Sequence, residues 1–138
     1  MKFATLALIG ITMLAGCSRR GDARLIGTWQ SDADKTIAQM KTTRTITEGP
    51  EAVLRKYYGH IKKTFTPTTY TMDANGAAGR NEVETVPYTI VHRDGDSITI
   101  KYRKNNKDLE TKILFDGSDG FWQAGDDTDK GEYYKRIN

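Results

Sequence analysis

The stretch Ser97-Ile98-Thr99-Ile100-Lys101-Tyr102-Arg103 is the most regular alternation of apolar and polar residues in the chain. Ile98, Ile100 and Tyr102 fall on one side of an extended backbone, while a threonine and two basic residues fall on the other. A period of two residues is typical of a β-strand with one buried face. The stretch therefore predicts a strand that contributes these three side chains to a core.

Similar segments on both sides predict further strands. Tyr88 and Ile90 share one side of the preceding segment, and Leu109, Ile113 and Phe115 share one side of the following one. Other strands are expected at residues 25–30, 61–66, 69–72, 120–124 and 132–137, with 35–45 as a less regular candidate. Turn signals separate the segments at Asn75-Gly76, Asp94-Gly95, Asp116-Gly117 and Asp119-Gly120.

One helix is expected to interrupt this pattern. Thr47-Glu48-Gly49-Pro50 is typical of a helix start with proline in the first turn, and apolar residues recur at helical spacing until Gly59. A succession of about eight or nine short strands joined by hairpin turns favours an antiparallel meander that closes into a barrel. The predicted fold is mainly β: a small barrel with one short helix.

The first residues predict export. After Lys2, residues 3–14 form an apolar run that is shorter than the roughly 20 residues of a membrane span. The run ends in Leu14-Ala15-Gly16-Cys17, which resembles the lipobox of bacterial lipoproteins. The resemblance implies cleavage between Gly16 and Cys17, a diacylglycerol thioether on Cys17, and acylation of the new amino group, for example by palmitate. The alternative is an ordinary signal peptide followed by an incidental cysteine.

The chain then divides into a signal peptide at 1–16, a lipidated tether at 17–23 and a barrel domain at 24–138. Two or three acyl chains give stable anchoring, so the resemblance implies a tethered protein that does not span the membrane. Ser18 follows the cysteine, which resembles lipoproteins sorted to the outer membrane, with the domain facing the periplasm; an inner-membrane location stays open. Because Cys17 is the single cysteine, no disulfide forms within the chain.

Two motifs at the ends of the expected domain resemble those of lipocalins and fatty-acid-binding proteins. Leu25-Ile26-Gly27-Thr28-Trp29 is similar to the glycine-x-tryptophan signature of their first strand. Glu132-Tyr133-Tyr134-Lys135-Arg136-Ile137 resembles the aromatic and basic last strand. The chain is thus identified as lipocalin-like, although the helix between early strands is more similar to fatty-acid-binding proteins.

The resemblance also implies how the barrel is closed. Gly27, Trp29 and Arg136 match the pattern in which an arginine of the last strand lies over the tryptophan, with Lys135 as an alternative to Arg136. Such a cation–π contact contributes about 0.5 to 2 kcal/mol.

The interior of an open barrel would bind a small hydrophobic or amphipathic ligand, and this is the expected function. Candidate lining residues are Tyr70, Tyr88, Ile98, Ile100, Tyr102, Phe115 and Trp122. Each of them also fits ordinary core packing. The alternative is a non-catalytic interaction module, a solid barrel that docks on an envelope protein partner. Cavity volume separates the two, because a ligand barrel encloses roughly 300 Å³ or more.

The charged residues do not favour nucleic acid. They make up 28% of the chain with a net charge of +3, and Arg55, Lys56, Lys62 and Lys63 form no dense stripe. We interpret them as solvated faces, with anionic lipid headgroups as a secondary partner.

Neither catalysis nor a cofactor is indicated. His60 and His92 are far apart and lack metal-ligand spacing, and His92 continues the face of Tyr88 and Ile90, which predicts a partly buried histidine. Asp126-Asp127-Thr128-Asp129 fails the EF-hand pattern and is interpreted as a hairpin loop. We therefore expect no enzyme activity, no metal and no cofactor.

Overall fold

A computed structural model describes residues 21–124 and 130–138. Its elements are β1 (Gly27–Ser31), α1 (Ala33–Thr43), α2 (Glu48–Tyr57), β2 (Lys62–Phe65), β3 (Thr69–Asp73), β4 (Val83–Asp94), β5 (Ser97–Lys104), β6 (Lys107–Asp116), β7 (Gly120–Ala124) and β8 (Lys130–Arg136). The signal peptide, the lipobox and Cys17 lie outside the described residues.

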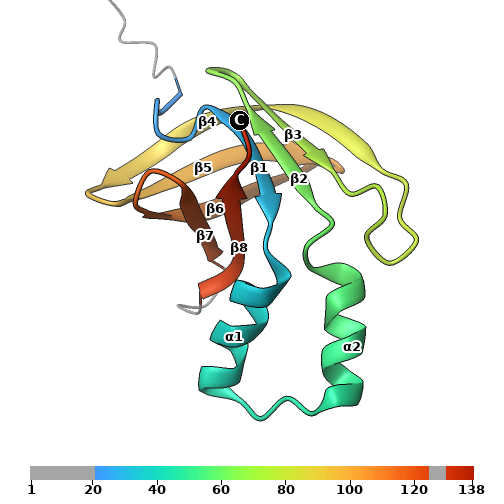
Figure 1. The fold of residues 1–138 in the computed structure, drawn as a ribbon. Helices are drawn as coiled ribbons and strands as arrows, with labels where there is room; N and C mark the ends of the chain where they lie inside the picture. The colour runs from blue at the N-terminus through green and yellow to red at the C-terminus, as the bar shows by residue number, and fades with distance from the viewer. Residues whose placement is uncertain (1–20, 125–129) are drawn as a thin grey trace, which may run out of the picture.

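The eight strands form a closed antiparallel barrel in which each strand pairs with the next one along the chain (Figure 1). Pairing of β8 with β1 closes the barrel and sets Trp29 opposite Arg136. The predicted small, mainly β barrel is confirmed. Both helices lie between β1 and β2 and extend from one end of the barrel.

The opposite end of the barrel is closed by Trp29. Its side chain is fully buried, its Nε1 donates to the carbonyl oxygen of Leu25 at 2.8 Å, and its ring meets that of Phe121 edge-on. The guanidinium carbon of Arg136 lies 4.1 Å from the centre of the Trp29 ring, so the expected stacking contact is present. Lys135, the alternative, instead pairs with Asp32.

Arg136 also satisfies the backbone around the tryptophan. Its Nη1 donates to the carbonyl of Ile26 at 2.9 Å and its Nη2 to that of Arg24 at 2.7 Å. Gly27 makes room for this side chain: it has a φ of +136°, and a Cβ there would lie 2.6 Å from Arg136 Nη1. The glycine of the motif is therefore required by both backbone conformation and space.

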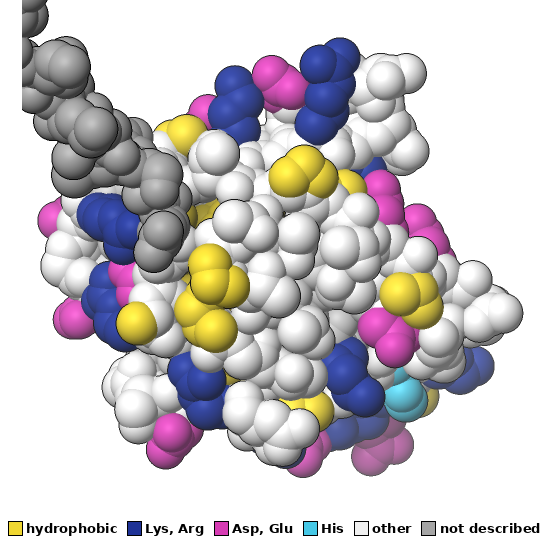
Figure 2. Space-filling view, turned by 90° about the horizontal axis from the view of Figure 1, so that it is seen from above, with side chains coloured by type: hydrophobic (Ala, Val, Ile, Leu, Met, Phe, Trp, Pro, Cys, Tyr) yellow, Lys and Arg dark blue, Asp and Glu magenta, His cyan; other side chains and the backbone are white. Residues whose placement is uncertain are grey.

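A buried carboxylate fastens the segment before β1 to the same end. Asp22 accepts from Nη2 of Arg24 at 2.9 Å and from Nη1 of Arg93 in β4 at 2.7 Å. The hydrogen bond with Arg24 holds the pKa of the Asp22 carboxyl below its usual value, against the opposing effect of burial. Figure 2 views this end from above: uncharged groups occupy its middle, and most charged side chains lie toward its edge.

The prediction of a single helix is wrong, because α1 occupies the stretch considered as a strand at 35–45. Asp32 caps α1 by accepting from the backbone N–H of Lys35 at 3.0 Å. Thr36 and Ile37 are buried, and Thr36 Oγ1 accepts from the backbone N–H of Tyr133 at 2.9 Å. This docking on β8 outweighs the weak helix propensity of the threonines.

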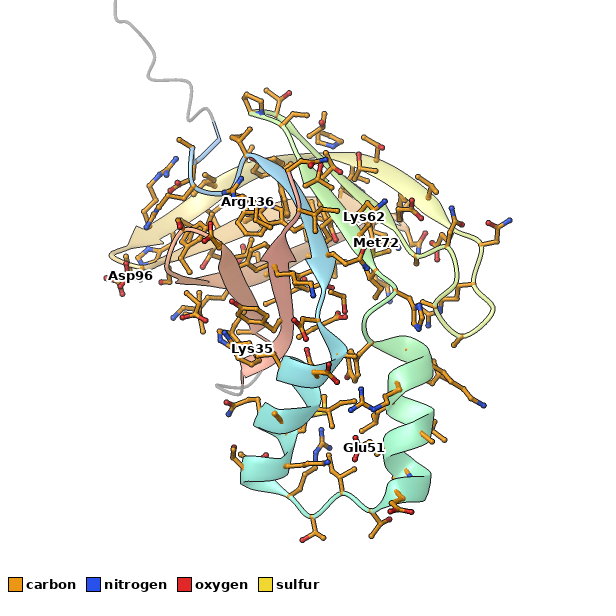
Figure 3. The ribbon with its side chains drawn as sticks, in the orientation of Figure 1. Lys35, Glu51, Lys62, Met72, Asp96 and Arg136 are labelled. Atoms are coloured by element: carbon orange, nitrogen blue, oxygen red, sulfur yellow. The ribbon has the colours of Figure 1, made fainter. Side chains whose placement is uncertain are left out.

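The predicted helix at residues 47–58 is confirmed as α2, which follows Thr47 and ends before Gly59. Glu51 lies between the two helices (Figure 3), where it pairs with Lys41 of α1 at 2.6 Å and Arg55 of α2 at 2.9 Å. No residue of α2 is buried. Charge pairs near the surface thus supply much of the contact between α1 and α2.

We predict that Trp29→Ala lowers the free energy of unfolding by about 3 to 5 kcal/mol, as for other buried large aromatic residues. The substitution removes the ring on which Arg136 rests and leaves a cavity at the closed end. Urea denaturation followed by far-UV circular dichroism measures the change. Tyr57→Ala on the exposed face of α2 is the control and is expected to stay within about 0.5 kcal/mol. A loss below about 1 kcal/mol for Trp29→Ala would contradict a role in closing the barrel.

Candidate functional site

A cavity of about 230 Å³ opens at the end of the barrel that carries the helices. Its wall includes the apolar or aromatic side chains of Ile61, Tyr70, Met72, Val86 and Tyr102. It also includes polar side chains: Lys63 and Gln123 on β2 and β7, and Glu132 on β8. The barrel is therefore packed solid at the Trp29 end and hollow at the other, with an amphipathic lining.

Among the polar residues of the cavity, Lys63 differs most from the sequence-based prediction. Within β2 the side chains alternate, so that Lys62 is exposed while Lys63 and Phe65 are buried. Only 3% of Lys63 is accessible to solvent. The prediction that Lys63 belongs to a solvated basic face is wrong, because the register of β2 with β1 and β3 turns it into the barrel.

Aromatic rings and an amide surround the Lys63 ammonium. Its Nζ donates to Oε1 of Gln123, lies 4.0 Å from the centre of the Tyr134 ring, and is 5.9 Å from that of Tyr70. Among residues 21–124 and 130–138, no carboxylate oxygen forms an ion pair with it. Within these two ranges, the partners of the cation are all neutral.

The other charged groups of the cavity have stronger partners. Glu132 accepts hydrogen bonds from the hydroxyls of Tyr134 and Ser31, one on each carboxylate oxygen. At the rim, Lys104 pairs with Glu84 at 2.7 Å. These contacts leave Lys63 as the cavity's one charged group without a charged or hydroxyl partner in the described part of the chain.

Burial lowers the pKa of Lys63 from 10.5 to about 8, and the negative charge of Glu132 opposes this change. Burial also raises the pKa of Tyr70 and Tyr134, and Glu132 adds to the effect on Tyr134. Near neutral pH the cavity therefore contains a lysine that is charged yet close to its titration, beside two protonated phenols.

The candidate lining residues separate into groups. Tyr70 and Tyr102 line the cavity, and their rings meet edge-on at 5.4 Å. Tyr88, Ile98 and Ile100 are core residues, packed in the same cluster as Trp29. Phe115 packs against the edge of the core, where the guanidinium carbon of Arg24 lies 4.3 Å from its ring centre. Of the seven predicted lining residues, two therefore line the cavity and four serve core packing.

Trp122 is the remaining candidate, and its prediction as a ligand-lining residue is wrong. Its neighbours in β7, Phe121 and Gln123, point into the barrel, so Trp122 points outward. It is nevertheless buried, because its ring packs edge-on against that of Tyr133 where α1 covers the barrel wall. Nζ of Lys35 lies 3.8 Å from the centre of the Tyr133 ring at this contact.

The lining residues that the sequence did not predict include the four that form the polar network of the cavity: Lys63, Gln123, Glu132 and Tyr134. The signal for Lys63 was the alternation Ile61, Lys63, Phe65, which places the lysine on the apolar side of the strand. Glu132 and Tyr134 lie in the last-strand motif and Gln123 lies outside it, but their proximity to Lys63 depends on barrel closure, which brings β8 and β7 next to β2 through β1.

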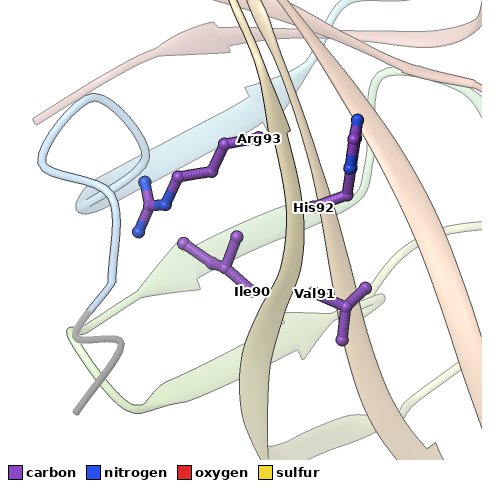
Figure 4. A pocket seen from close by; sticks show the side chains of 4 residues that line it. All are labelled: Ile90, Val91, His92 and Arg93. Atoms are coloured by element: carbon purple, nitrogen blue, oxygen red, sulfur yellow. The ribbon is translucent and has the colours of Figure 1, made fainter. Parts of the chain in front are cut away.

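A second hollow, of about 280 Å³, lies at a bulge in β4 between Ile90 and His92. The extra residue reverses the alternation: Ile90 and Arg93 point to one side of the strand, and Val91 and His92 to the other (Figure 4). The expectation of a partly buried His92 is therefore wrong, since this side chain is exposed. The bulge instead directs Arg93 toward Asp22.

No metal centre forms in the described ranges, where no three histidine, cysteine or acidic side chains are grouped to hold an ion. His60 is exposed, and its Nε2 lies 3.2 Å from the carbonyl oxygen of Arg55. The acidic segment Asp126-Asp127-Thr128-Asp129 lies outside the described residues. Within those residues, neither helix has the length and hydropathy needed to cross a bilayer.

Comparison with protein-family models, with curated proteins and with solved structures finds no significant match.

We predict that Lys63→Met stabilises the protein by about 1 to 3 kcal/mol at pH 7. A folded-state pKa of about 8, against 10.5 in the unfolded chain, means that burying the ammonium costs about 3 kcal/mol at this pH. Loss of the Gln123 hydrogen bond and the ring contacts offsets part of the gain. Urea denaturation at a series of pH values measures the difference.

The sign of the pH dependence provides a second check. Between pH 8 and 10.5 the unfolded chain binds more protons at this position than the folded protein, so wild type gains stability relative to Lys63→Met as the pH rises. Lys62→Met, which removes the neighbouring exposed lysine of the same strand, is the control. A pH-independent difference for Lys63→Met would contradict burial of the charged lysine.

Proposed function

We propose that the protein is a bacterial envelope lipoprotein whose periplasmic, lipocalin-like barrel binds a small amphipathic ligand without transforming it. The observation that carries the proposal is the half-filled barrel: one end is packed with aromatic side chains, and the other opens into a cavity with apolar walls and a few polar groups. Concave, largely apolar sites with a few convergent polar groups are typical of ligand pockets.

The cavity limits the size of this ligand. Its volume of about 230 Å³ lies below the roughly 300 Å³ expected for a ligand barrel, yet the interior at this end is not filled by side chains as in a solid barrel. A whole lipid with long acyl chains does not fit inside. We therefore infer that the ligand is short, or that only one end of it enters the barrel.

The attachment point supports a specific orientation. The backbone N–H of Gly21 donates to the carbonyl of Pro67 at 2.9 Å, at the Trp29 end of the barrel and away from the cavity mouth. Four residue steps separate Cys17 from Gly21, which span at most about 14 Å. With Cys17 lipidated, the closed end would lie near the membrane and the mouth would face away. The ligand would then enter from the aqueous side.

The alternative function, docking on an envelope protein, is favoured by one other observation. Helix α2 exposes Val53 and Tyr57, which are 51% and 46% accessible. With Ala78 and Gly79 they border a groove of about 540 Å³. The buried lysine has no explanation under this alternative, so ligand binding accounts for more of the structure.

We predict that the full-length protein, extracted in mild detergent and studied by native mass spectrometry, carries a reproducible small-molecule adduct. Denaturation should release this molecule for identification by mass. Met72→Trp, which fills the cavity from β3, is the matched control and should be isolated without the adduct. Wild-type protein that is consistently empty, or an adduct that Met72→Trp retains, would contradict ligand binding in the barrel.

For the anchor, we predict that Cys17→Ala abolishes acylation, releases the protein from the membrane fraction and leaves the signal peptide uncut or miscut. The thiol is the atom that carries the diacylglycerol, and alanine has none. Cell fractionation and intact-protein mass measure the result, with Ser18→Ala as the control that keeps the lipid. Unchanged processing and membrane retention of Cys17→Ala would contradict the lipobox.

A further inference from the structure

We propose that Lys63 is the recognition residue of the cavity and binds the anionic group, a carboxylate or a phosphate, of a short organic ligand. The inference rests on the proposed function, since it names the chemistry of the ligand that the barrel would hold. It begins from an uncommon placement: a lysine nearly inaccessible to solvent, inside a barrel, with its ammonium at the wall of a cavity.

The Lys63 ammonium has an incomplete set of partners. A buried charge is ordinarily paired with an opposite charge or held by several hydrogen bonds. Lys63 has the amide oxygen of Gln123 and the faces of Tyr134 and Tyr70, which are all neutral. An ammonium has three donors, so this set leaves room for a further acceptor. An anion in the adjoining cavity would complete it.

The other charged groups of the cavity are already occupied by partners within the chain. Glu132 has both carboxylate oxygens occupied by the hydroxyls of Tyr134 and Ser31, and the ring of Tyr134 lies against the Lys63 ammonium. At the rim, Lys104 is paired with Glu84. The positive charge still available to a ligand in this cavity is therefore that of Lys63.

The wall beside Lys63 suits an apolar portion of the ligand. Ile61, Met72 and Val86 give the wall an apolar surface beside the lysine. A ligand with a short apolar portion and one terminal anion would match both parts. The volume of about 230 Å³ restricts that portion to a few carbon atoms.

Titration of the lysine sets the pH range of binding. The ionisable groups that line the same cavity are Tyr70 on β3, Glu84 on β4, Tyr102 and Lys104 on β5, and Glu132 and Tyr134 on β8. Desolvation within this group lowers the pKa of Lys63 to about 8. The charged form binds an anion, so affinity should decrease as the pH rises above about 8, and a bound anion should raise the pKa of Lys63.

The test uses three probes of equal chain length: hexanoate, hexyl phosphate and the neutral hexanol. Full-length protein labelled with ¹³C-lysine, in lipid nanodiscs, is titrated at pH 7 while NMR follows the side-chain ε-carbon of Lys63, which is assigned from its absence in Lys63→Met. Empty nanodiscs correct for partitioning into lipid. Lys62→Met is the matched control, because it removes the neighbouring lysine on the outer face of the same strand.

We expect at least one anion to shift the Lys63 signal saturably and to raise its pKa by one unit or more. Hexanol should bind at least tenfold more weakly than that anion. The affinity for the anion is followed through the Lys63 ε-carbon in wild type and by calorimetry in the variants. It should fall at least tenfold in Lys63→Met and stay unchanged in Lys62→Met. The stronger of the two anions identifies the class of headgroup.

Several outcomes would overturn the inference. These are hexanol binding as tightly as both anions, an anion affinity that Lys63→Met retains, no saturable response of Lys63 to either anion, or a Lys63 pKa above 10 in the ligand-free protein. A reproducible neutral adduct in native mass spectrometry, lost in Met72→Trp, would leave the proposed function standing while this inference fails. An empty barrel in that experiment would remove both.

Discussion

The contact between the Arg136 guanidinium and the Trp29 ring is the constraint on which the barrel depends. It joins the first strand to the last and so completes the ring of strands at one end. Its geometry requires a glycine at position 27, because any side chain there would meet the guanidinium. At this end the guanidinium of Arg136 also donates to the carbonyls of residues 24 and 26, so one side chain satisfies two backbone acceptors beside the tryptophan.

Closure at one end explains why the cavity lies at the other. Phe65, Tyr88, Phe121 and Ile98 extend the packing from Trp29 into the barrel, and large side chains use up the available volume. Toward the helices the inward positions of β2, β7 and β8 change to Lys63, Gln123 and Glu132, which pack less densely and need partners. The change from aromatic to polar residues along the barrel axis therefore produces both the cavity and its chemistry.

Sequence alternation predicted the strand order and the barrel because each strand has one buried face, a local property. Gly27, Trp29 and Arg136 came instead from the resemblance of the first and last strands to lipocalin motifs, and the contact that it implied is present. Two errors had one cause, a contact that overrides a local signal: docking of Thr36 on Tyr133 turned a threonine-rich stretch into α1, and the bulge after Ile90 reversed the faces of His92 and Arg93. The error at Lys63 was of another kind, because the local alternation with Ile61 and Phe65 already placed this lysine on the buried face.

The position of Lys63 also bears on what the cavity is for. Stability alone would favour methionine there, since a buried ammonium with neutral partners lowers the free energy of unfolding near pH 7. Glu132 relieves only part of this cost: its charge raises the pKa of Lys63, but burial lowers that pKa more, and both of its carboxylate oxygens accept from hydroxyls. A destabilising charge at the wall of a cavity is explained when the charge has a partner outside the chain, and an anionic ligand supplies one. Under the proposal of an anionic ligand, the charge that destabilises the empty barrel is the charge that binds the ligand.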